Sequence, residues 1–109
     1  MKKRKFKIPI YFGTLIVIKT NDFKAVIKKY GLDKSSSECD AFVFRIETKK
    51  RLRYFAVFKK HNVSNIAHEA VHIVSDIFRD GGIIPDVKND EPQAYLTGWV
   101  ANKIHKTLK

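Results

Sequence analysis

Apolar and polar residues alternate with a period of two along two neighbouring stretches of the chain, residues 41–47 and 51–58. Side chains two residues apart lie on the same face of a β-strand, so this alternation predicts a strand in each stretch. The short polar link Thr48-Lys49-Lys50 between them indicates a β-hairpin. A second hairpin is predicted within residues 7–20, with its turn near Gly13.

In the sequence, each predicted hairpin is followed by a segment with the pattern of a helix. Residues 23–30 form a short apolar-periodic stretch that Asp22 can cap and Gly31 can end, and a polar loop is predicted at residues 35–37. A longer helix is predicted for residues 64–79, with Asp80-Gly81-Gly82 as its stop.

The last predicted helix starts near residues 89–92 and continues towards Leu108. Pro92 is tolerated in a first helical turn, where its missing N–H would have no partner. One side carries a core stripe at intervals of four residues, and Gly98 would allow a close approach of the last two helices. The stripe consists of Leu96, Val100, Ile104 and Leu108. We therefore predict one α+β domain over residues 1–109, with two β-hairpins and a short helix packed against a helix pair.

Length and cysteine content narrow the class of protein. A chain of 109 residues can bury one compact core but has no room for two domains. Its single cysteine, Cys39, excludes an internal disulfide and favours a reducing compartment, so a cytoplasmic location is expected. The apolar run at residues 8–18 is too short to span a bilayer, and Pro9 and Gly13 interrupt it. No membrane association is expected.

The charge of the chain is strongly positive, with 22 Lys and Arg against 11 Asp and Glu. A net charge of +11 favours contact with phosphate or with an acidic partner, so composition by itself allows a nucleic-acid partner. Five of these charges lie in residues 2–7, and residues 1–6 are expected to be a solvated basic arm that can stay disordered.

The motif that points to chemistry is His68-Glu69-Ala70-Val71-His72, a match to H-E-x-x-H. Four residues on a helix span about one turn, so both imidazoles project from one face and can bind one metal ion. This face is roughly opposite the predicted core stripe, which consists of Ile66, Ala70, Ile73, Val74 and Ile77. Glu69 is close enough to accept a proton from metal-bound water.

A third ligand is expected at the start of the next helix. Eighteen residues separate His72 from Glu91, which allows the first helix to end and the second to return against the histidine face. Two histidines and one carboxylate leave a fourth zinc position for water, as in catalytic zinc sites. The helix dipole also favours an acidic residue in a first turn, and Asp90 is the next choice as ligand.

The H-E-x-x-H motif followed after 18 residues by Glu91 in the string Asn89-Asp90-Glu91-Pro92-Gln93-Ala94 resembles the gluzincins, a group of zinc metallopeptidases. The likeness covers residues 65–95 and extends to small phage and mobile-element H-E-x-x-H proteins. It implies Zn²⁺ held by His68, His72 and Glu91, with Glu69 as the general base.

This chain also departs from the gluzincin pattern. Tyr95 occupies the position where gluzincins often have an aspartate that orients a zinc-bound histidine, and Asp76 is the candidate to replace it. Three residues are candidates to stabilise the oxyanion, Tyr95, Tyr54 and His105, and the sequence does not choose among them. His61 is expected to be a surface residue.

The resemblance implies a zincin-like fold and hydrolysis of a peptide or protein substrate by zinc-bound water that Glu69 assists. In zincins the substrate lies along an edge strand, and residues 51–58 are the expected strand. Basic residues around it would favour an acidic substrate. The alternative function is a non-catalytic basic binding protein with the same fold, such as a phage-type inhibitor or a nucleic-acid-associated factor. The two differ over Glu69, which only the enzyme needs.

Overall fold

The computed structural model describes residues 1–33 and 39–109, and this part of the chain contains four strands and three helices. The strands are β1 (Lys2–Lys7), β2 (Thr14–Lys19), β3 (Ala41–Glu47) and β4 (Leu52–Phe58). The helices are α1 (Phe23–Tyr30), α2 (Val63–Asp80) and α3 (Glu91–Leu108). The fold is therefore α+β, as the periodicities predict.

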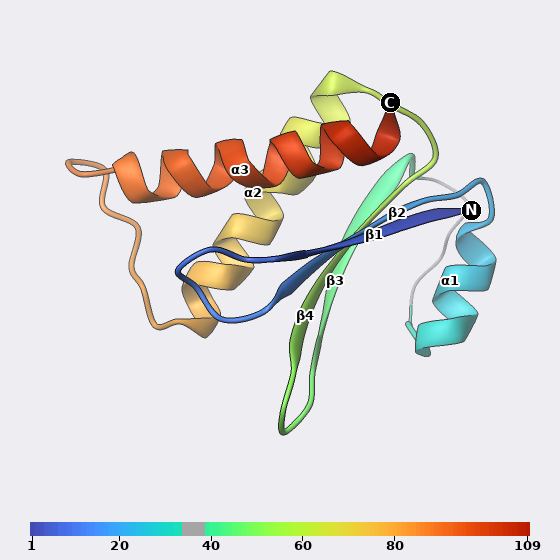
Figure 1. Ribbon diagram of the computed structural model, residues 1–109, viewed down its shortest axis with the longest axis horizontal. Helices are drawn as coiled ribbons and strands as arrows, with labels where there is room; N and C mark the ends of the chain where they lie inside the picture. The colour runs from blue at the N-terminus through green and yellow to red at the C-terminus, as the bar shows by residue number, and fades with distance from the viewer. Residues whose placement is uncertain (34–38) are drawn as a thin grey trace.

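The four strands form one mixed sheet in the order β1-β2-β4-β3 (Figure 1). β1 and β2 form one antiparallel hairpin, and β3 and β4 form the other. The hairpins join through β2 and β4, which run parallel to each other in the centre of the sheet. β1 and β3 are consequently the two edge strands.

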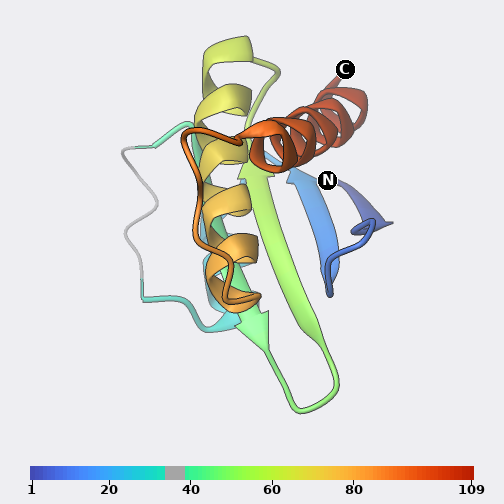
Figure 2. The ribbon, with the colours of Figure 1, turned by 90° about the vertical axis from the view of Figure 1, so that its left-hand side faces the viewer.

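Helices cover both faces of the sheet, as the two ribbon views show (Figures 1 and 2). α2 and α3 pack on one face, over a core that includes Leu15, Ala56 and Phe58. α1 packs on the other face, over a second core that includes Ile16 and Phe55. Because β2 and β4 are buried on both faces, their sequences are nearly continuous apolar runs.

Most of the predicted elements are confirmed. α1, β3, β4 and α2 begin and end within one residue of their predicted bounds, and α3 begins at Glu91. The Asp22 side chain accepts a hydrogen bond from the Ala25 N–H, and Gly31 ends α1 with a left-handed φ of 64°. The polar loop predicted at residues 35–37 lies outside the described residues.

The first hairpin lies nearer the N-terminus than its apolar run suggests. Residues 2–7 form strand β1 instead of a free basic arm, and residues 8–13 connect it to β2. Pro9 has no N–H for a sheet hydrogen bond, and the connection closes through the Ile8 N–H and the Gly13 carbonyl at 3.2 Å. A strand of mostly exposed basic residues is well placed at an edge, where charge opposes pairing with other chains.

One expectation about the sheet is wrong. Residues 51–58 do not provide an edge, because β4 pairs with β2 on one side and with β3 on the other. The strand order depends on a contact between the two hairpins, which periodicity within each hairpin does not reveal. Within the described residues, no helix has both the length and the apolar character that crossing a membrane requires.

Candidate metal centre

Helix α2 carries the H-E-x-x-H motif, and local sequence explains its start and its orientation. Asn62 precedes the helix, and its side chain accepts a hydrogen bond from the Asn65 N–H at 2.9 Å. The predicted core stripe is buried against the sheet and consists of Ile66, Ala70, Ile73, Val74 and Ile77. His68 and His72 are exposed, as the helical geometry predicts.

The two imidazoles approach each other closely. Nε2 of His68 lies 3.1 Å from Nε2 of His72, and the ring centroids are 4.8 Å apart. One oxygen of Glu69 completes a group of three potential ligand atoms that all lie within 4.8 Å of one another. A search of the described residues for three or more side chains that could together bind a metal ion finds this group alone.

The spacing of the imidazoles suits a zinc ion. Two nitrogen ligands of a tetrahedral zinc, each about 2.0–2.1 Å from the metal, lie roughly 3.3 Å apart. The observed separation of 3.1 Å between the Nε2 atoms is close to that value. The fold therefore places the two histidines so that they can share one ion without a change of helix geometry.

Glu69 differs from both histidines in its burial. Only 8% of the residue is exposed, and no hydrogen bond or ion pair joins its carboxylate to any residue in the described part of the chain. The carboxylate oxygens themselves remain accessible to solvent, so an ion or a water molecule can reach them. Sequence spacing located Glu69 beside the histidines but gave no sign of this burial.

The predicted third ligand, Glu91, is the first residue of α3, and its side chain is exposed. It does not belong to the group formed by His68, Glu69 and His72. Helices α2 and α3 nevertheless pack against each other. Asp90 and Val71, a residue of the motif, line the same hollow of about 380 Å³.

The candidate oxyanion residues lie elsewhere. Tyr95 is 77% exposed and lines a hollow on α3 that faces residues 9–11, and α2 provides no residue to that hollow. The Tyr54 side chain is fully buried, and its hydroxyl donates to Asp80 Oδ2 at 2.7 Å. His105 is hydrogen-bonded to His61, with Nδ1 of the former 2.8 Å from Nε2 of the latter.

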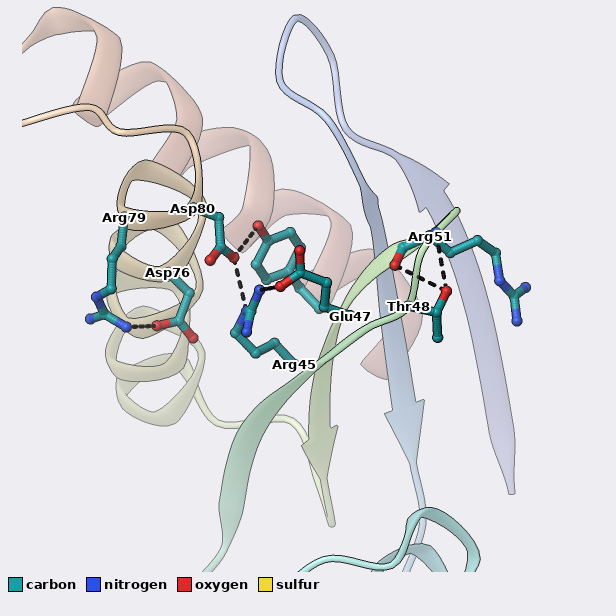
Figure 3. Close-up of polar contacts among 8 residues, drawn as sticks. Arg45, Glu47, Thr48, Arg51, Asp76, Arg79 and Asp80 are labelled. Carbon is teal, nitrogen blue, oxygen red and sulfur yellow. Dashed lines mark hydrogen bonds and ion pairs between the residues drawn. The ribbon is translucent and has the colours of Figure 1, made fainter.

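The proposed orienting residue, Asp76, has a different partner. Its Oδ1 accepts a hydrogen bond from Arg79 Nη1 at 3.0 Å (Figure 3). No hydrogen bond or ion pair joins Asp76 to His72 in the described part of the chain. The aspartate therefore stabilises the last turns of α2.

A polar network that the sequence did not predict fixes α2 against the sheet (Figure 3). Asp80, the last residue of α2, accepts hydrogen bonds at Oδ2 from Tyr54 of β4 and from Arg45 Nε of β3, the latter at 2.9 Å. Arg45 also pairs with Glu47 at 2.9 Å, and this hydrogen bond raises the pKa of Arg45. Burial and the hydrogen bond to Asp80 raise the pKa of Tyr54.

The pairing of His61 with His105 was also missed. His61 is exposed, as predicted, but it contacts a residue 44 positions later in the chain. A separation of that size carries no local signal, because the contact exists only after α3 has packed across the sheet.

Comparisons of the chain with protein-family models, with curated proteins and with solved structures found no match.

Proposed function

We propose that this chain is a small zinc-dependent peptidase of gluzincin type with a zincin-like arrangement of its α+β fold. The observation that supports this most is the His68–His72 pair, with 3.1 Å between the Nε2 atoms and an oxygen of Glu69 within 4.8 Å of both imidazoles.

The chemistry of each side chain suggests its role in the proposed reaction. His68 and His72 would hold the ion, and a carboxylate from the start of α3, Glu91 or Asp90, would complete the ligand set. Bound zinc supplies Lewis acidity towards a carbonyl oxygen and lowers the pKa of water. The Glu69 carboxylate accepts a proton from the attacking water and returns it to the leaving amine.

The edge strand beside α2 is β3, and it replaces β4 as the strand on which a substrate can lie. Residues Ala41–Glu47 pair with β4 on one side, and no strand in the described part of the chain pairs with the other side of β3. β3 packs against α2, to which the Arg45–Asp80 contact ties it. An extended peptide can add main-chain hydrogen bonds along such an edge.

Metal stoichiometry and hydrolysis test this function together. Purified wild type is expected to contain one zinc per chain by mass spectrometry, and His68→Ala is expected to lose it. Glu69→Gln is expected to keep the zinc and to cleave an unstructured protein such as casein at least about 100-fold more slowly, because a general base contributes about 10²–10⁴-fold.

His61→Ala is the matched control, since it removes an exposed imidazole that lies outside the candidate centre. It is expected to leave zinc content unchanged. Wild type that binds no zinc would falsify the proposal, as would a Glu69→Gln variant that retains full hydrolysis.

The third ligand can be assigned by two neutral substitutions at neighbouring positions. Glu91→Gln is expected to weaken zinc binding if the start of α3 closes on the histidines through Glu91. Asp90→Asn is expected to do so if the side chain already beside Val71 is the ligand. Unchanged zinc affinity in both variants would contradict a carboxylate from α3.

The alternative is a non-catalytic binding protein, and the specific observation in its favour is the net charge of +11. This alternative function predicts that wild type shows no hydrolysis and that the Glu69→Gln variant binds the partner as wild type does. One face of a protein can bind a partner while another face carries out hydrolysis. The location of the positive charge therefore indicates where a binding face would lie.

A further inference from the structure

Positive charge is concentrated in the first part of the chain. Residues 1–60 carry 17 Lys and Arg against five Asp and Glu, whereas residues 61–109 carry five against six. The first part supplies the sheet and α1, and the second supplies α2 and α3. The candidate metal centre therefore lies on the nearly neutral side of the molecule, and the positive excess lies on the sheet and α1.

Part of this charge surrounds a hollow of about 370 Å³ between the two turns of the sheet. The turn between β1 and β2 forms one wall, and the turn between β3 and β4 forms the other. Its lining includes three cations and two aromatic rings but no acidic residue. The lining consists of Lys7, Tyr11, Phe12, Gly13, Thr14, Lys50, Arg51 and Leu52.

The three cations of this hollow are free to bind an anion. In the described part of the chain, Lys7, Lys50 and Arg51 form no ion pair, and Arg51 hydrogen-bonds to Thr48 through its backbone alone. The nearby Glu47 is paired with Arg45. Figure 3 shows the Arg51 side chain pointing away from the Arg45–Asp80 contacts.

An exposed aromatic ring stands beside these cations. Phe12 is 63% exposed, whereas its neighbour Tyr11 packs its ring against Phe78 at a centroid distance of 5.8 Å. An exposed phenyl ring gains nothing from the core, and it offers a flat apolar face next to three positive charges. The Thr14 side chain adds a hydroxyl to the same lining.

A basic strand leads away from the hollow. Lys3, Lys5 and Lys7 of β1 alternate along the strand and so lie on one face of the sheet, where Lys3 Nζ donates to the Tyr30 hydroxyl of α1 at 3.3 Å. Side chains on one face of a strand repeat every 6–7 Å or so. Cations at this interval can follow a chain of phosphates.

We propose that this surface, the hollow together with β1, binds single-stranded nucleic acid. Phosphates would contact Lys7, Lys50 and Arg51, and an unpaired base would stack on Phe12. A nucleotide carries an anion and a flat aromatic face on one unit, and the hollow offers partners for both. In a polynucleotide every unit repeats the same pairing of an anion with a flat aromatic face, whereas an acidic peptide has no such regular repeat.

The test is the fluorescence anisotropy of a labelled 20-nucleotide deoxythymidine strand in 100 mM salt. The double variant Lys50→Glu/Arg51→Glu is expected to bind at least about tenfold more weakly than wild type. The control Lys88→Glu reverses one exposed charge in the segment before α3 and is compared with Lys50→Glu, which changes the net charge equally. It is expected to change affinity less than about threefold, because the Debye length of roughly 10 Å limits its effect.

Phe12→Ala separates stacking from charge. It is expected to weaken binding by about tenfold without changing the slope of log affinity against log salt, since the ring carries no charge. Equal losses in the hollow and control charge variants, or full affinity in Phe12→Ala, would overturn the proposal. Binding of wild type to phosphatidylserine vesicles but not to the oligonucleotide would overturn it as well.

The proposal is independent of the metal centre. His68→Ala and Glu69→Gln are expected to bind the oligonucleotide as wild type does, because both positions lie on α2. If the chain proves not to be a peptidase, oligonucleotide binding still tests the nucleic-acid proposal by itself.

Discussion

Asp80 joins three elements through one carboxylate oxygen. Oδ2 accepts a hydrogen bond from the Tyr54 hydroxyl of β4 at 2.7 Å and from Arg45 Nε of β3 at 2.9 Å, while its backbone ends α2. Hydrogen bonds to a charged group contribute more than neutral ones. This residue therefore fixes the end of the helix that carries the candidate metal centre.

Tyr54→Phe removes one of these bonds and keeps the packing of the ring. Since Asp80 retains Arg45, we expect a loss of about 1–2 kcal/mol in the free energy of unfolding at pH 7. Urea titration monitored by circular dichroism measures it. A cost below about 0.3 kcal/mol would show that the hydroxyl contributes nothing to the native state.

The same residue predicts a pH dependence. Burial and the hydrogen bond to Asp80 raise the pKa of Tyr54, so the folded chain keeps the phenol proton at pH values where the unfolded chain has lost it. The stabilising contribution is complete below the unfolded pKa of about 10 and decreases as the pH rises above it. Wild type is expected to lose more stability than Tyr54→Phe between pH 9 and pH 11. Parallel curves for the two proteins would contradict this.

The candidate site was partly predictable at the level of residues. The spacing of His68 and His72 was sufficient to place both imidazoles on one exposed face, because a helix has a fixed period. The burial of Glu69 and the Tyr54–Asp80 bond were not predictable, because both depend on how α2 lies against the sheet.

At the scale of elements, Gly98 has a different role from the predicted one. A Cβ built at Gly98 meets no atom within 4 Å, so this glycine does not allow a close approach of helices. Gly98→Ala is expected to stabilise the protein by up to about 1 kcal/mol, the helix-propensity difference between the two residues. Thermal and urea unfolding measure the gain, and a destabilised variant would contradict it.

Gly13→Ala is the contrasting substitution. Its φ is 119°, and an added Cβ would lie 3.0 Å from both the Leu52 carbonyl oxygen and Cε2 of Tyr54. We expect a loss of about 2 kcal/mol from strain and crowding in the turn. A cost near zero would mean that the turn can relax without disturbing β4.

The elements themselves were predictable from periods of two and 3.6, since each period is a local property. The parallel pairing of β2 with β4 was not predictable from these periods. Without it, β4 was wrongly expected to be an edge strand. Neighbouring hairpins can join through any pair of strands, and the choice depends on which faces the helices cover.

At the scale of the whole molecule, a bound ion should stabilise the fold. Zinc at 100 times its dissociation constant is expected to add about 2.7 kcal/mol to the free energy of unfolding. For a chain of this size the melting temperature would rise by roughly 10–20 °C. Differential scanning fluorimetry with and without a chelator measures the change.

Magnesium is the matched control for this measurement, because it prefers oxygen ligands and should not bind an imidazole pair. Neither magnesium with wild type nor zinc with His68→Ala should change the melting temperature. An equal rise in His68→Ala would place the zinc elsewhere on the chain.

The parallel seam between β2 and β4 also determines the order of events when the chain folds. Its partners, such as Thr14 and Arg53, lie 39 positions apart, whereas each hairpin closes within its own short segment. Local contacts form fast and distant ones slowly. We expect both hairpins to form early and the folding rate to be limited by their docking. Substitutions in the seam should then slow folding, whereas those in α1 should mainly speed unfolding.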